Sequence, residues 1–78
     1  MATRISVVYA RAATGLKLWP IAVFCNSETA AEDARAYAAA ALAEGKRFRA
    51  GTGIQTVAHA EAREYGTWTQ IPAFSKDF

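Results

Sequence analysis

The sequence predicts an α+β fold, in which a small antiparallel β-sheet carries one helix on one face. Three observations support this prediction: short runs rich in β-branched residues alternate between two faces, one Ala-rich segment has helical spacing, and turn residues separate these segments. The chain has 78 residues, of which 53% are hydrophobic, and a formal net charge of +2. It is therefore expected to form one domain over residues 1–78 and is too apolar for a disordered tail.

Two strands are expected first, over residues 5–10 and 18–25. Both runs are rich in β-branched and aromatic residues, and a turn signal at residues 14–15 lies between them. This arrangement predicts an antiparallel hairpin. Pro20 lacks an amide donor, so its stretch is expected at a sheet edge or at a bulge, with Trp19 near an unpaired border.

A helix is expected over residues 29–43. Thr29, followed three residues later by Glu32, has the spacing of a capping box, and acidic side chains in the first turns suit the helix dipole. Gly45 is expected to end the helix. The residues at helical spacing on one face, expected to pack on the sheet, are Ala30, Ala34, Tyr37, Ala38, Ala41 and Leu42.

Two or three further strands are expected after the helix, from the runs 46–49, 54–59 and 67–71. Residues 60–66 have the composition of a polar loop that ends at Gly66. The predicted element order is therefore β-β-α-β-β, in one antiparallel sheet.

Few residues have the pattern of a catalytic or metal site. His59-Ala60-Glu61 matches the first half of the zinc deaminase signature, but the downstream Pro-Cys-x-x-Cys is missing and the one cysteine, Cys25, lies upstream. Cys25 and His59 are the sole nucleophile–base pair, and no third residue is evident to orient them. Glu61 and Glu64 are interpreted as solvated loop acids. We therefore expect no enzyme activity, no metal and no cofactor.

The cysteine count and hydropathy bear on the compartment. A single cysteine argues against a disulfide-held secreted scaffold. No stretch approaches the roughly 20 apolar residues that a membrane helix needs. We therefore expect a cytoplasmic protein without a membrane partner.

A basic cluster with an aromatic residue follows the helix. Arg47 and Arg49, with Phe48 between them, could hold a single-stranded nucleic acid by phosphate contact and base stacking. In an alternating strand, however, Phe48 would face the core and its basic neighbours would be solvated, and this is the interpretation we favour. Gly51 and Gly53 match no phosphate-loop signature and are interpreted as turn residues.

Charge alternates along the chain, and this favours a protein-binding surface. Residues 1–27 contain bases and no acid, residues 28–44 are mainly acidic and residues 45–58 are basic. Protein-docking surfaces often mix charges in this way, which steers the partner. Nine aromatic residues exceed what so small a core can hide, so some are expected to be exposed as interface anchors. The expected partner-binding residues are Glu28, Glu32, Asp33, Trp19, Tyr65 and Trp68.

The chain resembles small phage-encoded anti-CRISPR proteins. The resemblance lies in its size and in the order of a strand pair ending at Asn26-Ser27, a helix beginning with Glu28-Thr29-Ala30-Ala31-Glu32-Asp33-Ala34-Arg35, and further strands. It implies a protein that binds a CRISPR surveillance complex in the host cytoplasm, with type I complexes favoured, and blocks its DNA-binding surface. Several such proteins are strongly acidic DNA mimics, and this slightly basic chain departs from them.

Three functions therefore remain open from the sequence. The first is inhibition of a host complex, in which the acidic helix start would meet the basic DNA path. The second is a small nucleic-acid-binding phage regulator that uses Arg47, Phe48 and Arg49. The third is a subunit of a larger assembly. The chain by itself is expected to be a monomer or a small homo-oligomer.

Overall fold

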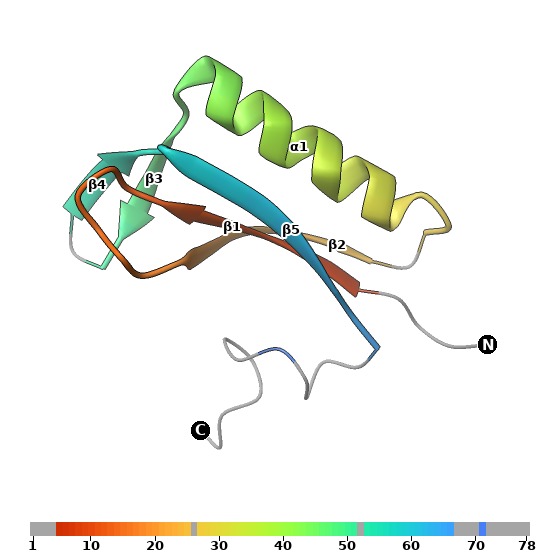
Figure 1. Ribbon diagram of the computed structural model, residues 1–78. Coiled ribbons are helices and arrows are strands. Elements are labelled where there is room, and N and C mark those ends of the chain that lie inside the picture. Colours follow the sequence, from red (N-terminus) through yellow and green to blue (C-terminus); the bar gives the residue numbers. More distant parts are fainter. Residues whose placement is uncertain (1–4, 26, 52, 67–70, 72–78) are drawn as a thin grey trace.

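The computed structural model describes residues 5–25, 27–51, 53–66 and 71. One helix packs against a small antiparallel sheet, which confirms the predicted α+β class (Figure 1). In chain order the elements are β1 (Ile5–Arg11), β2 (Trp19–Cys25), α1 (Ala30–Glu44), β3 (Arg47–Ala50), β4 (Gly53–Thr56) and β5 (His59–Tyr65).

The described strands form two antiparallel units instead of the one sheet that we expected. β1 lies in the centre of a three-stranded sheet, between β2 and β5, and the predicted β1–β2 hairpin is confirmed. β3 and β4 form a separate two-stranded ribbon. The two residues between β4 and β5 connect the ribbon to the sheet, because the amide of Val57 donates to Lys46 O at 2.8 Å and that of Ala58 donates to Arg11 O at 2.9 Å. Among the described residues, β2 and β5 are the edge strands of the three-stranded sheet, and β3 and β4 each pair with a strand on one side only.

Residues 60–66 were wrongly expected to be a loop. Residues 59–65 form β5 and pair with the whole of β1, from Ile5 opposite Tyr65 to Arg11 opposite His59. The polar side chains of β5 alternate with Ala60 and Ala62, which pack with the buried Val8 under the helix. The expected strand over 54–59 is split, since β4 ends at Thr56. Residues 67–70 of the expected last strand lie outside the described residues.

The helix covers residues 30–44 instead of the expected 29–43, and Gly45 ends it as predicted. The capping box is not formed: Thr29 donates its hydroxyl proton to Asp33 Oδ2 at 3.0 Å and has no side-chain bond to the helix amides. Gly45 ends the helix in the left-handed conformation, with φ 63°, which glycine adopts without steric cost.

Alanines form the buried face of α1. Ala30, Ala34, Ala38 and Ala41 are buried, and Ala34 and Ala38 contact Val8 of the central strand. Small side chains let the helix approach the sheet closely, although each buries little area. Leu42 was wrongly assigned to this face and is 47% exposed.

A β-bulge in β2 sets the position of Trp19. Val8 pairs with Ala22 and Tyr9 with Pro20, so Ile21 is the extra residue. The predicted bulge near Pro20 is thus confirmed, and β2 lies at the sheet edge as expected. Without the extra residue, side-chain alternation would place Trp19 on the face of Val23. With it, Trp19 pairs with Ala10 and packs on Phe48 of the ribbon.

The opposite face of the three-stranded sheet has its own apolar cluster. Ile5, Val7 and Tyr9 of β1 are buried there together with Ile71. Ile71, from the last part of the chain, therefore contributes to this second core. The helix and the ribbon share the other face of the sheet (Figure 1).

Candidate functional site

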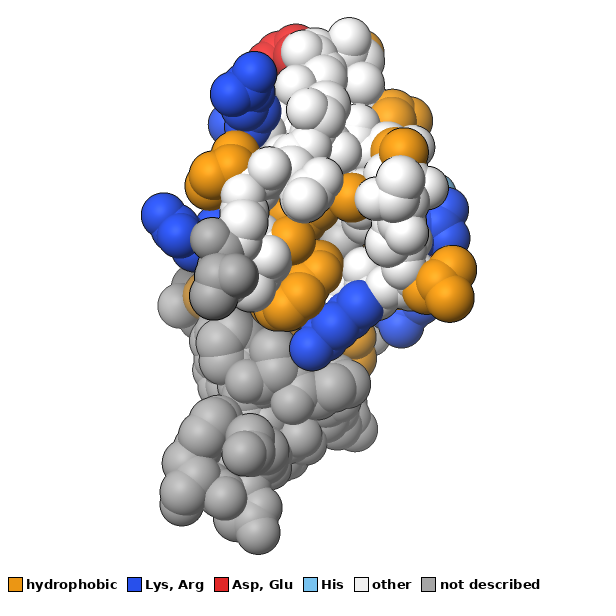
Figure 2. Space-filling model, turned by 90° about the vertical axis from the view of Figure 1, so that its left-hand side faces the viewer, with side chains coloured by type: hydrophobic (Ala, Val, Ile, Leu, Met, Phe, Trp, Pro, Cys, Tyr) orange, Lys and Arg blue, Asp and Glu red, His pale blue; other side chains and the backbone are white. Residues whose placement is uncertain are grey.

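An open groove of about 270 Å³ lies where β2, the second half of α1 and β3 meet. Its floor and walls combine apolar and aromatic side chains with three cations. The lining residues are Pro20, Ile21, Tyr37, Lys46, Arg47, Phe48 and Arg49. Figure 2 views this end of the molecule and shows Lys and Arg side chains around exposed hydrophobic surface.

The β3 edge of the groove presents main-chain groups that pair with no strand in the described part of the chain. In an antiparallel pair, residues that exchange hydrogen bonds with the partner strand alternate with residues whose N–H and C=O point the other way. Lys46 O accepts from Val57 N, so the next hydrogen-bonded pairs are Phe48 with Gln55 and Ala50 with Gly53. The N–H and C=O groups of Arg47 and Arg49 therefore point away from β4, toward the groove.

The side chains of β3 follow the alternation that we favoured from the sequence. Phe48 is 7% exposed and packs on Ala10, Ala12 and Val57, whereas Arg47 and Arg49 are exposed. The structure thus brings two residues of the predicted nucleic-acid set together with Lys46 at the groove. Phe48, however, is a core residue, so its alternative role as an exposed stacking platform is wrong.

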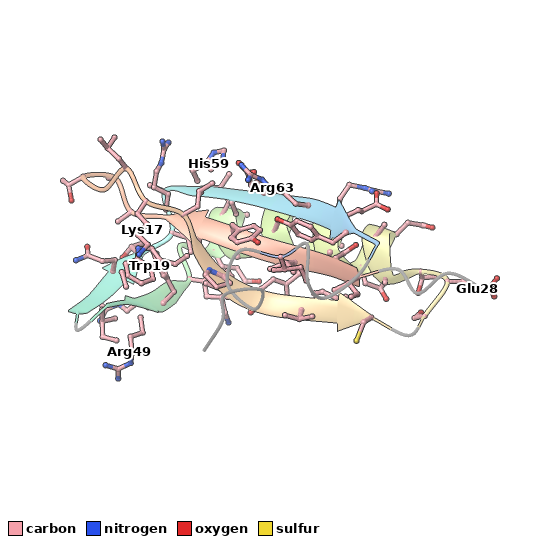
Figure 3. All side chains as sticks on the ribbon, turned by 90° about the horizontal axis from the view of Figure 1, so that it is seen from below. Lys17, Trp19, Glu28, Arg49, His59 and Arg63 are labelled. Carbon is pink, nitrogen blue, oxygen red and sulfur yellow. The ribbon has the colours of Figure 1, made fainter. Side chains whose placement is uncertain are left out.

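Lys17 and Trp19 extend the basic surface beyond β3. The Lys17 Nζ lies 4.3 Å from the centroid of the Trp19 ring, within the range of a cation–π contact. Trp19 also packs against the ribbon, where its ring lies next to Gly51. Figure 3 shows Lys17, Trp19 and Arg49 at the same end of the molecule. Sequence reasoning missed Lys17, because only the fold brings its loop next to the ribbon.

The acidic start of the helix lies at the opposite end. Glu28, Glu32 and Asp33 are all exposed, and Figure 3 shows Glu28 far from Arg49. A helix of 15 residues is about 22 Å long, and this length separates its acidic first turn from Lys46. The six residues predicted to bind a partner therefore do not form one surface.

Of the remaining members of that predicted set, Trp19 lies at the opposite end from the acids, whereas Tyr65 lies at the same end of the sheet as the helix start but on the face that packs with Ile5 and Ile71. Trp19 is half-buried at the basic end, and Tyr65 is half-buried at the end of β5, opposite Ile5. The hydroxyl groups of Tyr65 and Tyr9 are hydrogen-bonded at 2.9 Å. Trp68 lies outside the described residues.

A row of polar side chains runs along the outer face of β5. His59 Nε2 lies 2.9 Å from Glu61 Oε1, and Arg63 Nε donates to the other carboxylate oxygen. Hydrogen bonds from His59 first, and then from Arg63, lower the pKa of Glu61. On β1, burial and the hydrogen bond with Tyr65 raise the pKa of Tyr9. These contacts are those of an ion-pair network on a strand surface.

The candidate catalytic residues do not come together. Cys25 pairs with Ile5 at one end of β1 and His59 pairs with Arg11 at the other end, six residues away. At the rise of a strand this separation is roughly 20 Å. Within residues 5–25, 27–51, 53–66 and 71, no three His, Cys, Asp or Glu side chains are grouped as metal ligands would be.

The described part of the chain contains no helix that is long and apolar enough to span a membrane. No protein-family model, no curated protein and no solved structure matches this chain.

Proposed function

We propose that this chain is a non-enzymatic binding protein that docks on a larger host assembly. The assembly that we propose is a type I CRISPR surveillance complex in the host cytoplasm, whose DNA-binding surface the chain blocks. The observation that supports docking is the separation of charge: an exposed acidic helix start lies at one end of the molecule and an exposed basic groove at the other. Two poles of opposite sign orient a protein during its encounter with a charged partner.

In this proposal the acidic pole, consisting of Glu28, Glu32 and Asp33, faces the basic path that DNA takes through the complex. Glu32 and Asp33 lie in the first turn of α1 and Glu28 lies just before it, at the start of a helix whose alanine face packs on the sheet. Bound there, they would compete with DNA phosphates for the same Lys and Arg side chains.

The experiment is an affinity pull-down from nuclease-treated lysate of bacteria that express a type I complex, followed by a DNA-binding assay with the purified complex. We expect stoichiometric Cas subunits to be retained and target-DNA binding to be inhibited. The Glu28→Lys/Glu32→Lys/Asp33→Lys variant should inhibit at least tenfold less. Glu44→Lys, at the other end of the same helix, is the matched control and should inhibit normally. A folded triple variant with full inhibition would remove the acidic pole from the proposal, and no retained Cas subunits would contradict the choice of target.

A second candidate function is direct binding of nucleic acid, as in a small phage regulator. The observation that favours it is the gathering of Lys17, Lys46, Arg47 and Arg49 at one end of the fold. Four phosphate contacts to a single strand would make the affinity fall about fifty-fold between 50 and 200 mM salt. Binding of an oligonucleotide without this salt dependence, or no binding, would contradict it.

A further inference from the structure

We propose that the groove between β2 and β3 binds an extended acidic segment of a protein partner, and that this segment pairs as an added strand with the free edge of β3. The inference rests on the proposed function only in taking the partner to be a protein. It assigns a second contact surface, remote from the acidic pole.

The main chain of β3 is the first support. Arg47 and Arg49 direct their N–H and C=O groups away from β4, on the side where the groove lies. An unpaired strand edge of this kind is the template on which extended peptides add by main-chain hydrogen bonds. Two residues on one edge offer two donors and two acceptors, the complement of one extended peptide segment.

The opposite wall of the groove does not compete for this role. β2 has Pro20, which lacks an amide proton, and the bulge at Ile21 interrupts its regular geometry. Proline and bulges are the features that keep edge strands from pairing with other chains. The added segment is therefore expected to pair with β3, while β2 contributes side-chain contacts.

The groove side chains define the chemistry of the segment. Lys46, Arg47 and Arg49 are cations, and the described residues that line the groove include no acid. The exposed Arg47 and Arg49 side chains lie on one face of β3, and Phe48 lies on the other, toward the core. Cross-strand neighbours share a face, so the segment should alternate acidic residues beside the two arginines with an apolar residue beside Phe48.

The same main-chain geometry favours a peptide over nucleic acid at this edge. A phosphate only accepts hydrogen bonds, and it would be repelled by the carbonyl oxygens that Arg47 and Arg49 turn toward the groove. A peptide segment donates and accepts alternately and satisfies both. The cations alone do not distinguish the two ligands, and the test therefore includes both.

The test uses ¹⁵N-labelled protein titrated with the capped peptide Val-Glu-Val-Glu-Val-Glu and followed by amide resonances. We expect the outward amides of Arg47 and Arg49 to shift more than those of Phe48 and Ala50, which bond to β4. The Arg47→Glu/Arg49→Glu variant should bind at least tenfold more weakly. Arg35→Glu, an exposed charge reversal on α1, should bind normally. The same peptide with alternate N-methyl groups should lose binding, because it cannot form the strand hydrogen bonds.

The outcomes of these experiments would each support or overturn a part of the proposal. Equal binding of the N-methylated peptide would overturn strand addition, and equal binding by the folded double variant would overturn the assignment of an acidic segment. An oligothymidylate that binds tighter than the peptide and shifts the same amides would also overturn it, in favour of nucleic acid. If the peptide fails while Cas subunits are still retained in the pull-down, the groove assignment falls and the proposed function stands. Peptide binding without retained Cas subunits sustains the groove and removes the proposed target.

Discussion

Replacing Phe48 with alanine should remove a large part of the stability of the protein. Phe48 is 7% exposed and is the largest side chain of the cluster that joins the β3–β4 ribbon to the sheet. Truncation of a buried Phe costs about 3–5 kcal/mol, from lost burial and from the cavity that remains. A chain of this length has a total stability of about 4–12 kcal/mol. The variant should therefore be marginally folded, and the packing of Trp19 should loosen with the ribbon.

The assay is thermal and urea unfolding followed by circular dichroism and by Trp fluorescence. At about 4–8 °C per kcal/mol, Phe48→Ala should lower Tm by at least 12 °C. Ile54→Ala is the matched control, because Ile54 lies in the same ribbon but is 53% exposed. Half of a buried Ile side chain is worth about 1 kcal/mol, so this variant should lose no more than about 8 °C. Equal losses in the two variants would refute the assignment of Phe48 to the core.

Three further predictions concern single contacts. Glu61→Gln should destabilise the protein by up to about 1 kcal/mol at pH 7, and this difference should disappear on acidification. A carboxyl whose pKa is lowered below its usual 4.5 stabilises the fold above that value and loses the effect as the pH falls through its folded pKa. Urea unfolding of both proteins from pH 7 to 3 measures the difference, and a constant difference would contradict the prediction. Gly51 has φ 66°, so Gly51→Ala should lower the free energy of unfolding by about 1 kcal/mol. Gly51→Asn should lower it less, because Asn tolerates this conformation. Thermal unfolding compares the two variants, and equal losses would show that φ does not limit this position. Tyr9→Phe should lower the free energy of unfolding by about 1 kcal/mol, because the hydrogen bond to Tyr65 is lost. In an alkaline absorbance titration, this variant should also lack the tyrosine that ionises last. An unchanged titration would contradict the raised pKa of Tyr9.

The elements that local sequence signals define were predicted correctly. Gly45 ends the helix because its left-handed conformation is a property of the residue itself. The β1–β2 hairpin follows from two β-rich runs around a turn. Pro20 predicted the irregularity of β2, because proline has no amide proton to donate. The inward side chain of Phe48 followed from strand alternation alone.

β5 was missed because its strand character comes from non-local pairing. Its inward residues are Ala60 and Ala62, whose small side chains give little apolar signal, and its outward residues are charged. The hydrogen bonds of β1 and the closeness of the alanine face of α1 stabilise this strand in the folded protein. Leu42 shows the converse error, since helical spacing suggested burial but the side chain is 47% exposed.

The candidate binding surfaces were likewise predictable in part from the sequence and in part only from the tertiary structure. The sequence by itself determined which residues carry charge, that Arg47 and Arg49 share one face of a strand, and that acids crowd the helix start. Only the tertiary structure decided that Lys17 joins the arginines, that the acids lie at the other end, and that β3 has a free edge beside β2. The reason is physical: charge and alternation are properties of neighbouring residues, whereas a groove depends on the bulge, the helix length and the ribbon attachment, which arise from contacts between distant segments.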